Sequence, residues 1–155
     1  MSDNFTVILD DAALQSRLAE VVARLERPGE LMDRIGAQLK KNINLRFDTK
    51  TDPNGQPWAP LRESTRKRYA KQDGERPQGS LLQRTGDMLA SLDFNFGADH
   101  VEVGFGDPIA AFHETGTSKM TDRGMLTANP FTGELGAGDR ADVLDVVSGY
   151  LAELL

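Results

Sequence analysis

Apolar residues recur at helical spacing in the stretch that follows the N-terminus. The first such stripe consists of Leu14, Leu18, Val21 and Leu25. The residues lie three or four positions apart until Pro28 and Gly29 break the pattern. A short β-prone run at residues 5–9 precedes them. The pattern predicts a strand followed by an amphipathic helix that ends before Pro28.

A second helical stripe follows directly. It consists of Leu31, Ile35, Leu39, Ile43 and Phe47. Charged residues occupy the opposite side of this predicted helix: Asp33, Lys40, Lys41 and Arg46. We interpret both stretches as amphipathic helices that pack on a common core.

Alternation with a period of two marks a hairpin in the second half of the chain. Phe94 and Phe96 alternate with polar residues, residues 97–100 have turn composition, and Val101, Val103 and Phe105 alternate again. Before this hairpin, a short basic helix is predicted over 64–72. A connector without apolar residues follows that helix at 73–79.

A final helix is predicted to open at Asp139. Its apolar side carries Val143, Leu144, Val147, Tyr150, Leu151 and Leu154. The order of elements indicates an α+β fold, in which a small antiparallel sheet packs with amphipathic helices. The length of 155 residues is typical of a single domain, which we assign to 1–155.

Two long loops interrupt these elements. Residues 48–61 combine turn residues with two prolines around Trp58, the only tryptophan. We expect a mobile loop here, with Trp58 either anchoring it to the body or serving as a binding hot spot. Residues 118–138 show no sustained period, so this segment contains either a missed strand or a functional arm.

The composition excludes several common kinds of catalytic site. The chain is 39% apolar and 27% charged, contains no cysteine and has two histidines. Thiolate metal sites and cysteine nucleophiles are therefore excluded, and we expect neither a metal nor a cofactor. No apolar run approaches the ~18 residues of a membrane span, and the N-terminus lacks the pattern of a signal peptide.

His113 and Glu114 are the remaining candidates for catalysis. The HExxH spacing of a zinc site fails because residue 117 is threonine. The interpretation that we favour is a structural protein without enzymatic activity. A small hydrolase that uses His113 and Glu114 is the alternative.

Charge is divided unevenly along the chain, whose net value is −6. Residues 1–84 hold fifteen Lys/Arg and twelve Asp/Glu, whereas residues 85–155 hold three and twelve. The division indicates either two differently solvated faces or a subunit whose opposite charges stack against copies of itself.

Seven of the cations fall between residues 62 and 84, where Tyr69 is the only aromatic residue. One aromatic side chain is little for a platform that stacks single-stranded nucleic acid. Contact with an acidic neighbour is therefore the favoured interpretation of this basic segment. Contact with DNA is the alternative.

Several motifs, in order, resemble those of the phage virion morphogenesis family, which includes tail completion proteins of P2-like and Mu-like contractile-tailed phages. Residues 52–61 read D-P-N-G-Q-P-W-A-P-L, similar to the family's D-P-x-G-x-x-W-x-x-L. Residues 81–92 resemble its L-x-x-T-G-x-L-x-x-S-[IL] segment. Residues 111–117, 123–126 and 139–151 are similar to three later segments.

The resemblance implies a structural virion protein with a fold like that of neck and tail-terminator proteins. Such a subunit would be assembled in the host cytoplasm into a ring, which we expect to be a hexamer, at the head-proximal end of the tail. Its partners would be the tail tube, the tail sheath or neck connector proteins, with no membrane involved. A head-completion adaptor that contacts DNA through 62–84 is the alternative.

We expect contacts with subunits or partners from the loop around Trp58, the basic segment 62–76 and residues 116–123. The candidates are Trp58, Arg62, Arg66, Lys67, Arg68, Lys71, Arg76, Gly116, Thr117, Lys119 and Arg123.

Overall fold

The computed structural model describes residues 12–73 and 81–154. The β-prone run at 5–9, Arg76 and most of the connector at 73–79 lie outside these residues.

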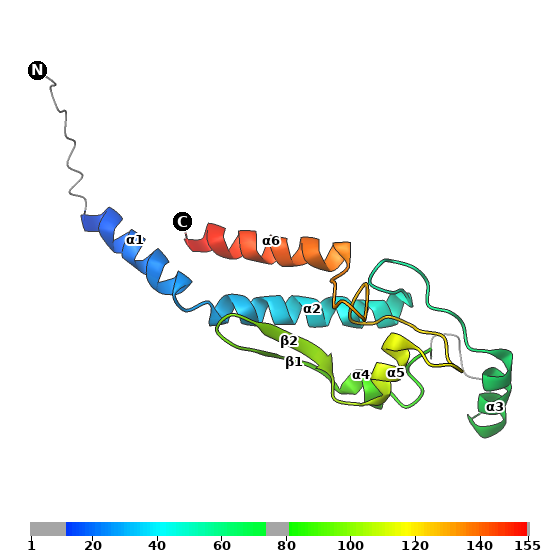
Figure 1. Ribbon diagram of the computed structural model, residues 1–155. Helices are drawn as coiled ribbons and strands as arrows, with labels where there is room; N and C mark the ends of the chain where they lie inside the picture. The colour runs from blue at the N-terminus through cyan, green and yellow to red at the C-terminus, as the bar shows by residue number, and fades with distance from the viewer. Residues whose placement is uncertain (1–11, 74–80, 155) are drawn as a thin grey trace, which may run out of the picture.

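Helix α2 (Gly29–Thr49) forms the axis of the molecule. Helix α6 (Ala137–Leu154) lies along one side of it, and a hairpin of β1 (Leu92–Phe96) and β2 (Val101–Phe105) lies along the other (Figure 1). The strands pair antiparallel with Phe94 opposite Val103, which confirms the predicted hairpin. The α+β class is therefore confirmed.

Close approach of the hairpin to α2 depends on a glycine. A Cβ at Gly36 would overlap the ring of Phe94, so the missing side chain makes room for the aromatic ring of β1. The sheet consequently packs directly on the helix backbone, and its other face remains open.

The remaining helices lie at the two ends of this arrangement (Figure 1). Helix α1 (Ala12–Leu25) extends from one end, and α3 (Glu63–Asp73) extends from the other. Both confirm predicted helices. Two short helices, α4 (Asp87–Ala90) and α5 (Ile109–Thr115), were not predicted because they are too brief to establish a periodic pattern.

The hydrophobic core surrounds the C-terminal end of α2. Phe47 and Met125 are fully buried, and the rings of Phe47 and Trp58 meet edge to face with centroids 5.2 Å apart. The other members of this core are Ile43, Leu81, Met88, Leu92 and Ala110. Trp58 thus folds back onto the body of its own chain, as one of the two interpretations predicted.

The prediction for Arg46 was wrong. Arg46 lies on the buried side of α2, where it forms an ion pair with Asp139 and donates a hydrogen bond to the carbonyl of Met125 at 2.8 Å. Asn42 donates to the other carboxylate oxygen of Asp139 at 3.0 Å. Helix α6 begins two residues earlier than predicted, and Asp139 is buried in its first turn. A charge placed 93 residues away in sequence therefore decides the burial of Arg46.

The expectation that both N-terminal helices pack on a common core holds for α2 and fails for α1. None of the residues of α1 is buried. Three of the four residues of its apolar stripe, Leu14, Leu18 and Leu25, are exposed because α1 continues beyond the end of the body, past the break at Pro28 (Figure 1).

Residues 118–138 contain turns and isolated bridges, such as the one between Asn129 and Glu134, with no strand. Their middle part belongs to the body of the chain, because Met125 is fully buried. Gly136 packs so closely on the carbonyl of Pro53 that a Cβ would overlap it. Only the exposed parts of this segment are thus free to reach a neighbour.

Candidate partner-binding face

Two loops that are distant in sequence fasten to each other beside the core. The indole Nε1 of Trp58 donates to the carbonyl of Gly124 at 2.9 Å. Arg123 donates through Nε to the carbonyl of Ala59 at 2.7 Å and through Nη2 to that of Pro60 at 3.1 Å. Two of the motif segments, 52–61 and 123–126, are therefore one structural unit.

Glu114 holds the same loop from the opposite side. Its buried carboxylate accepts hydrogen bonds from the backbone N–H groups of Met125, Leu126 and Thr127, the shortest at 2.6 Å, and from the hydroxyl of Thr127. Successive amides that converge on one carboxylate order the backbone that carries them. Because both of its carboxylate oxygens accept hydrogen bonds, Glu114 has a structural role here. The neighbouring His113 therefore has no free carboxylate from Glu114 to act with.

Gly116 begins the tight turn that precedes this loop. Its φ of 72° lies in the left-handed region, and a Cβ would crowd the carbonyl of Met120 and the N–H of Asp122. Thr117 and Met120 exchange two backbone hydrogen bonds, at 2.8 and 3.1 Å. The turn therefore requires glycine at this position, independently of any partner.

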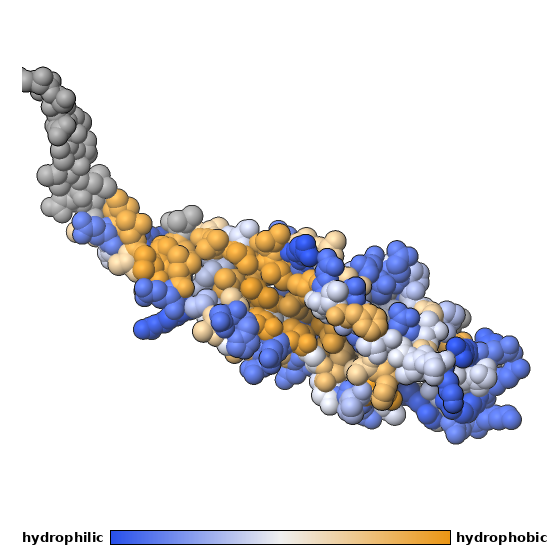
Figure 2. All heavy atoms as spheres, viewed as in Figure 1, coloured by the Kyte–Doolittle hydropathy of each residue, from blue (hydrophilic) through white to orange (hydrophobic). Residues whose placement is uncertain are grey.

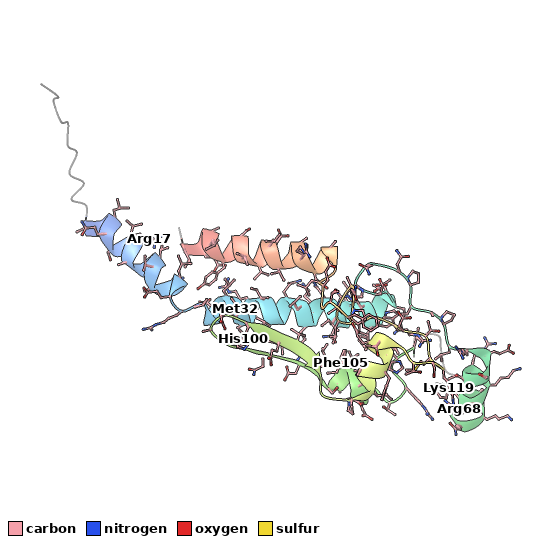
Figure 3. All side chains as sticks on the ribbon, in the orientation of Figure 1. Arg17, Met32, Arg68, His100, Phe105 and Lys119 are labelled. Carbon is pink, nitrogen blue, oxygen red and sulfur yellow. The ribbon has the colours of Figure 1, made fainter. Side chains whose placement is uncertain are left out.

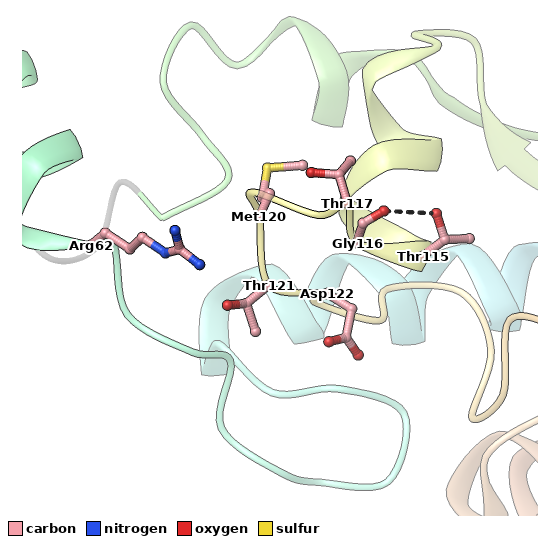
Figure 4. A pocket seen from close by; sticks show the side chains of 7 residues that line it. All are labelled: Arg62, Thr115, Gly116, Thr117, Met120, Thr121 and Asp122. Atoms are coloured by element: carbon pink, nitrogen blue, oxygen red, sulfur yellow. Dashed lines mark hydrogen bonds between the residues drawn. The ribbon is translucent and has the colours of Figure 1, made fainter.

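A pocket of about 340 Å³ opens between this turn and Arg62, whose guanidinium extends toward it (Figure 4). Apart from Met120, its lining is polar and consists of Arg62, Thr115, Gly116, Thr117, Thr121 and Asp122.

A second pocket of about 450 Å³ adjoins the first, since Arg62, Met120 and Thr121 line both. Helix α3, residues 82–86, α5 and residues 119–123 form its walls. Its cationic lining residues are Arg62, Arg68, Arg84, Lys119 and Arg123. Asp107 is the only acidic residue among those that line it. Figure 3 shows Arg68 and Lys119 close together at this end of the molecule.

Two of these cations share one aromatic ring. The guanidinium carbons of Arg68 and Arg84 lie 5.4 and 4.5 Å from the ring centroid of Tyr69. The negative face of an aromatic ring attracts cations, so Tyr69 holds two like charges near each other. Arg84 also donates to Gln72 at 3.2 Å. The arrangement concentrates positive charge where an anionic group can approach.

His113 also lines this pocket. Its Nδ1 is buried and has no hydrogen-bond partner among the described residues. Burial and, to a lesser extent, the nearby charge of Arg123 hold the pKa of His113 below its usual value. The imidazole is therefore neutral at neutral pH, and the positive charge of the pocket comes from arginine and lysine.

The structure brings together only some of the candidates from the sequence. Arg62, Lys119 and Gly116 lie around the two pockets together with Arg68, Thr117 and Arg123. Arg66, Lys67 and Lys71 are exposed on α3 outside the pocket linings, and Lys67 pairs with Glu63 at 2.9 Å. The side chain of Trp58 is buried in the core, so any contact near it would involve its exposed loop neighbours.

Three residues of this face were not among the candidates for contact with a partner, namely Tyr69, Arg84 and His113, the last of which was considered only for catalysis. Tyr69 could have been found, because it is the only aromatic residue in the basic segment. Arg84 could have been found in the same way, because it ends that segment, whereas His113 reaches the pocket only through the folding of α5 beside residues 82–86 and α3.

A model of the phage virion morphogenesis family matches residues 9–152. The chain belongs to this family. Its members' role in building phage particles makes the protein a component of virion morphogenesis, as the resemblance implied. Searches of curated proteins and of solved structures returned no match.

Within residues 12–73 and 81–154, no group of three or more histidine and acidic side chains is arranged to hold a metal ion. In the same ranges, no helix combines the length and the hydropathy that are needed to cross a bilayer.

Proposed function

We propose that this family member is a tail completion or tail terminator subunit, which forms a hexameric ring at the head-proximal end of a phage tail and joins the tail to the neck. In this role the cationic pocket receives an acidic surface of a neighbouring copy or of a tail or neck protein. No bond is made or broken, and the protein acts by attachment.

The observation that carries the proposal is the gathering of four exposed cations, Arg62, Arg68, Arg84 and Lys119, around one pocket in a chain of net charge −6. All of the acidic excess lies in residues 85–155, and α6 alone carries four acidic residues and one basic residue. A subunit with a cationic end and an acidic helix is suited to repeated head-to-tail contact.

Charge reversal in the pocket tests this proposal. Arg68→Glu should abolish joining of tails to heads in a phage that carries it, because it places a carboxylate inside a site for acidic groups. Arg66→Glu is the matched control, since it makes the same change on α3 outside the pocket lining. Electron microscopy of lysates should show separate heads and tails for the first variant and joined particles for the second.

If Arg68→Glu and Arg66→Glu gave the same proportion of joined particles, the pocket would not be the site that binds the acidic partner. Gold labelling of the protein in intact particles tests the location separately. A label away from the head-proximal end of the tail would overturn the assignment as a tail completion subunit.

Contact with DNA is the second candidate, favoured by the pairing of Arg68 and Arg84 on Tyr69. The same pairing argues against stacking of bases, because the guanidinium groups lie over the aromatic ring that a base would use. This candidate predicts binding to duplex DNA that weakens steeply as salt increases. Absence of binding at low salt, measured by fluorescence anisotropy, would exclude it.

A further inference from the structure

The cationic pocket beside α3 has an apolar lining as well as a charged one. Apart from the exposed Ile109, its apolar residues are buried or half-buried, namely Leu61, Leu82, Met88 and Met120. The four exposed cations belong to the hydrophilic surface that Figure 2 shows over this end of the molecule. A simple anion would leave the apolar lining in contact with water, so the ligand that fits combines negative charge with hydrophobic groups.

The backbone at Leu82 supports a binding role for this lining. Its φ of 61° lies in the left-handed region, which is unfavourable for a residue with a Cβ. Such conformations persist where the surrounding structure enforces them, and they cluster at sites that hold ligands. An apolar side chain in the wall of the pocket is thus held at a cost to the backbone.

The size of the pocket indicates how much of a partner can enter it. Its volume of about 450 Å³ lies within the range of pockets that take small ligands. A few side chains of one short segment would fill this space. The ligand is therefore a short acidic segment that also carries hydrophobic residues.

Residues 1–11 of this chain have that combination of groups. They read M-S-D-N-F-T-V-I-L-D-D, with three aspartates, neither lysine nor arginine, and hydrophobic residues at 5 and 7–9. The connector 74–80 follows α3 in sequence and reads G-E-R-P-Q-G-S, so it has no net charge and no large hydrophobic side chain. Of these two segments, only residues 1–11 match the pocket in both respects.

The pocket that residues 1–11 can reach belongs to another copy. The segment precedes α1, which lies at the opposite end of the molecule from α3 (Figure 1). To enter its own pocket it would have to return along α1, about 21 Å, and then α2, about 32 Å, at 1.5 Å per residue. Eleven fully extended residues span at most about 40 Å.

We infer that residues 1–11 of one copy bind in the cationic pocket of the next copy, with their hydrophobic side chains on its apolar lining and their aspartates near its exposed cations. Each copy then donates one segment and receives another, which is a heterologous contact that can close into a ring. The inference rests on the proposed function, in which this pocket receives an acidic part of a neighbour, and it names that part.

The absence of cysteine makes a direct test possible. Two full-length single variants, Thr6→Cys and Thr121→Cys, are expressed in the same cell and oxidised, so that a disulfide joining one of each is intermolecular by construction. Thr121 is exposed and lines the pocket, so its replacement changes no cation and no core residue. We expect this mixed dimer on non-reducing gels, identified by mass spectrometry.

Ser148→Cys in place of Thr121→Cys is the matched control, because Ser148 is exposed on α6 outside both pockets, and it should give no such product. The same pairs are introduced into phage particles, so that the contact is probed in solution and in the virion.

Further changes separate the two kinds of group. In the Thr6→Cys chain, Asp10→Asn/Asp11→Asn removes carboxylates at nearly constant size, and Ile8→Asn removes a hydrophobic side chain. Each should lower the yield of mixed dimer several-fold. In the Thr121→Cys chain, Arg68→Glu should lower it and Arg66→Glu, outside the pocket lining, should not. Thermal unfolding of each variant checks that the body of the chain is intact.

Three results would overturn the inference. If assembled protein gives no mixed dimer while Arg68→Glu still separates heads from tails, another acidic group occupies the pocket, and the proposed function is unaffected. If Thr6→Cys and Thr121→Cys placed in one chain form an intramolecular disulfide, the segment occupies the pocket of its own copy. If the wild-type chain is monomeric in solution and in particles, the ring of the proposed function fails as well.

Discussion

The two ends of α2 meet different surroundings, although the same helical stripe runs along both. At the C-terminal end, Ile43, Arg46 and Phe47 are buried by Trp58, Met125 and the start of α6. At the N-terminal end, Gly36 is the buried residue, and the adjoining α1 has none. The larger part of the core thus lies at one end, while the helix that adjoins the other end leaves apolar side chains exposed.

Electrostatic contacts follow the same division. Near the core end, Arg46 and Asp139 join α2 to α6 with side chains that are 9% and 2% exposed. Near the open end, Arg34 and Glu153 join the same two helices at 2.9 Å with side chains that are 37% and 55% exposed. Solvent screens the exposed Arg34–Glu153 pair, so breaking it costs little. Breaking the buried Arg46–Asp139 pair leaves one charge in the interior without a partner.

The largest expected effect is at the core end. Phe47→Ala removes a fully buried ring and should lower the free energy of unfolding by about 4 kcal/mol, the range for large-to-small changes in a core. Leu18→Ala on α1 should change it by less than about 0.5 kcal/mol in the monomer. Urea denaturation at low protein concentration measures both, and equal losses would contradict the division between the two ends.

The next effect concerns the two ion pairs. Asp139→Ala leaves the guanidinium of Arg46 buried without its carboxylate, so we expect a loss of about 3 kcal/mol in the free energy of unfolding. The double variant Arg46→Met/Asp139→Leu should recover most of it, because no charge then remains buried.

Glu153→Gln is the control for this pair, since it breaks the exposed contact with Arg34 and should cause a much smaller loss. A double variant as unstable as Asp139→Ala alone would mean that the ion pair itself stabilises the fold.

A smaller effect is expected where Glu114 fastens residues 125–127. Glu114→Gln replaces one acceptor oxygen with a donor that faces backbone N–H groups, and should cost about 2 kcal/mol. Amide hydrogen exchange at Met125, Leu126 and Thr127 should accelerate. Glu134→Gln, on an exposed part of the same segment, should leave this exchange unchanged.

The smallest expected effect is on how the free energy of unfolding varies with pH, to which the two histidines contribute with opposite signs. Burial lowers the pKa of His113 in the folded state, so the unfolded chain takes up its proton first as pH falls below about 6.5. His113 therefore contributes stability that is complete above that pH and is lost below it. His113→Gln should flatten the decline of unfolding free energy on the acidic side of about pH 6.5.

His100 provides the contrast, because its hydrogen bond with Asp99 at 2.8 Å raises its pKa. Its contribution is complete below about pH 6.5 and is lost as pH rises through the folded pKa. His100→Asn should remove this opposite dependence in urea titrations at several pH values. The same pH profile for both variants would contradict the environments that the structure gives them.

Much of the fold could be predicted from local pattern. The stripe of α2, the break at Pro28 and the alternation around residues 97–100 are properties of neighbouring residues, and the corresponding elements were found. The candidate face was predicted in part, since Arg62, Arg68 and Lys119 do line one pocket. Its other members join through folding of distant segments, which no local spacing reveals.

The sequence alone determined where the four longer helices and the hairpin form, the overall charge division and the family, because each depends on residue order over short distances. Tertiary structure decided which stripe is buried and which is left open. Leu18 and Phe47 occupy equivalent positions in similar patterns, yet only Phe47 has Trp58 and Met125 to cover it. Likewise, nothing in the local sequence distinguishes Arg46 from a solvated arginine. Its burial depends on the ion pair with Asp139, which only long-range packing brings beside it.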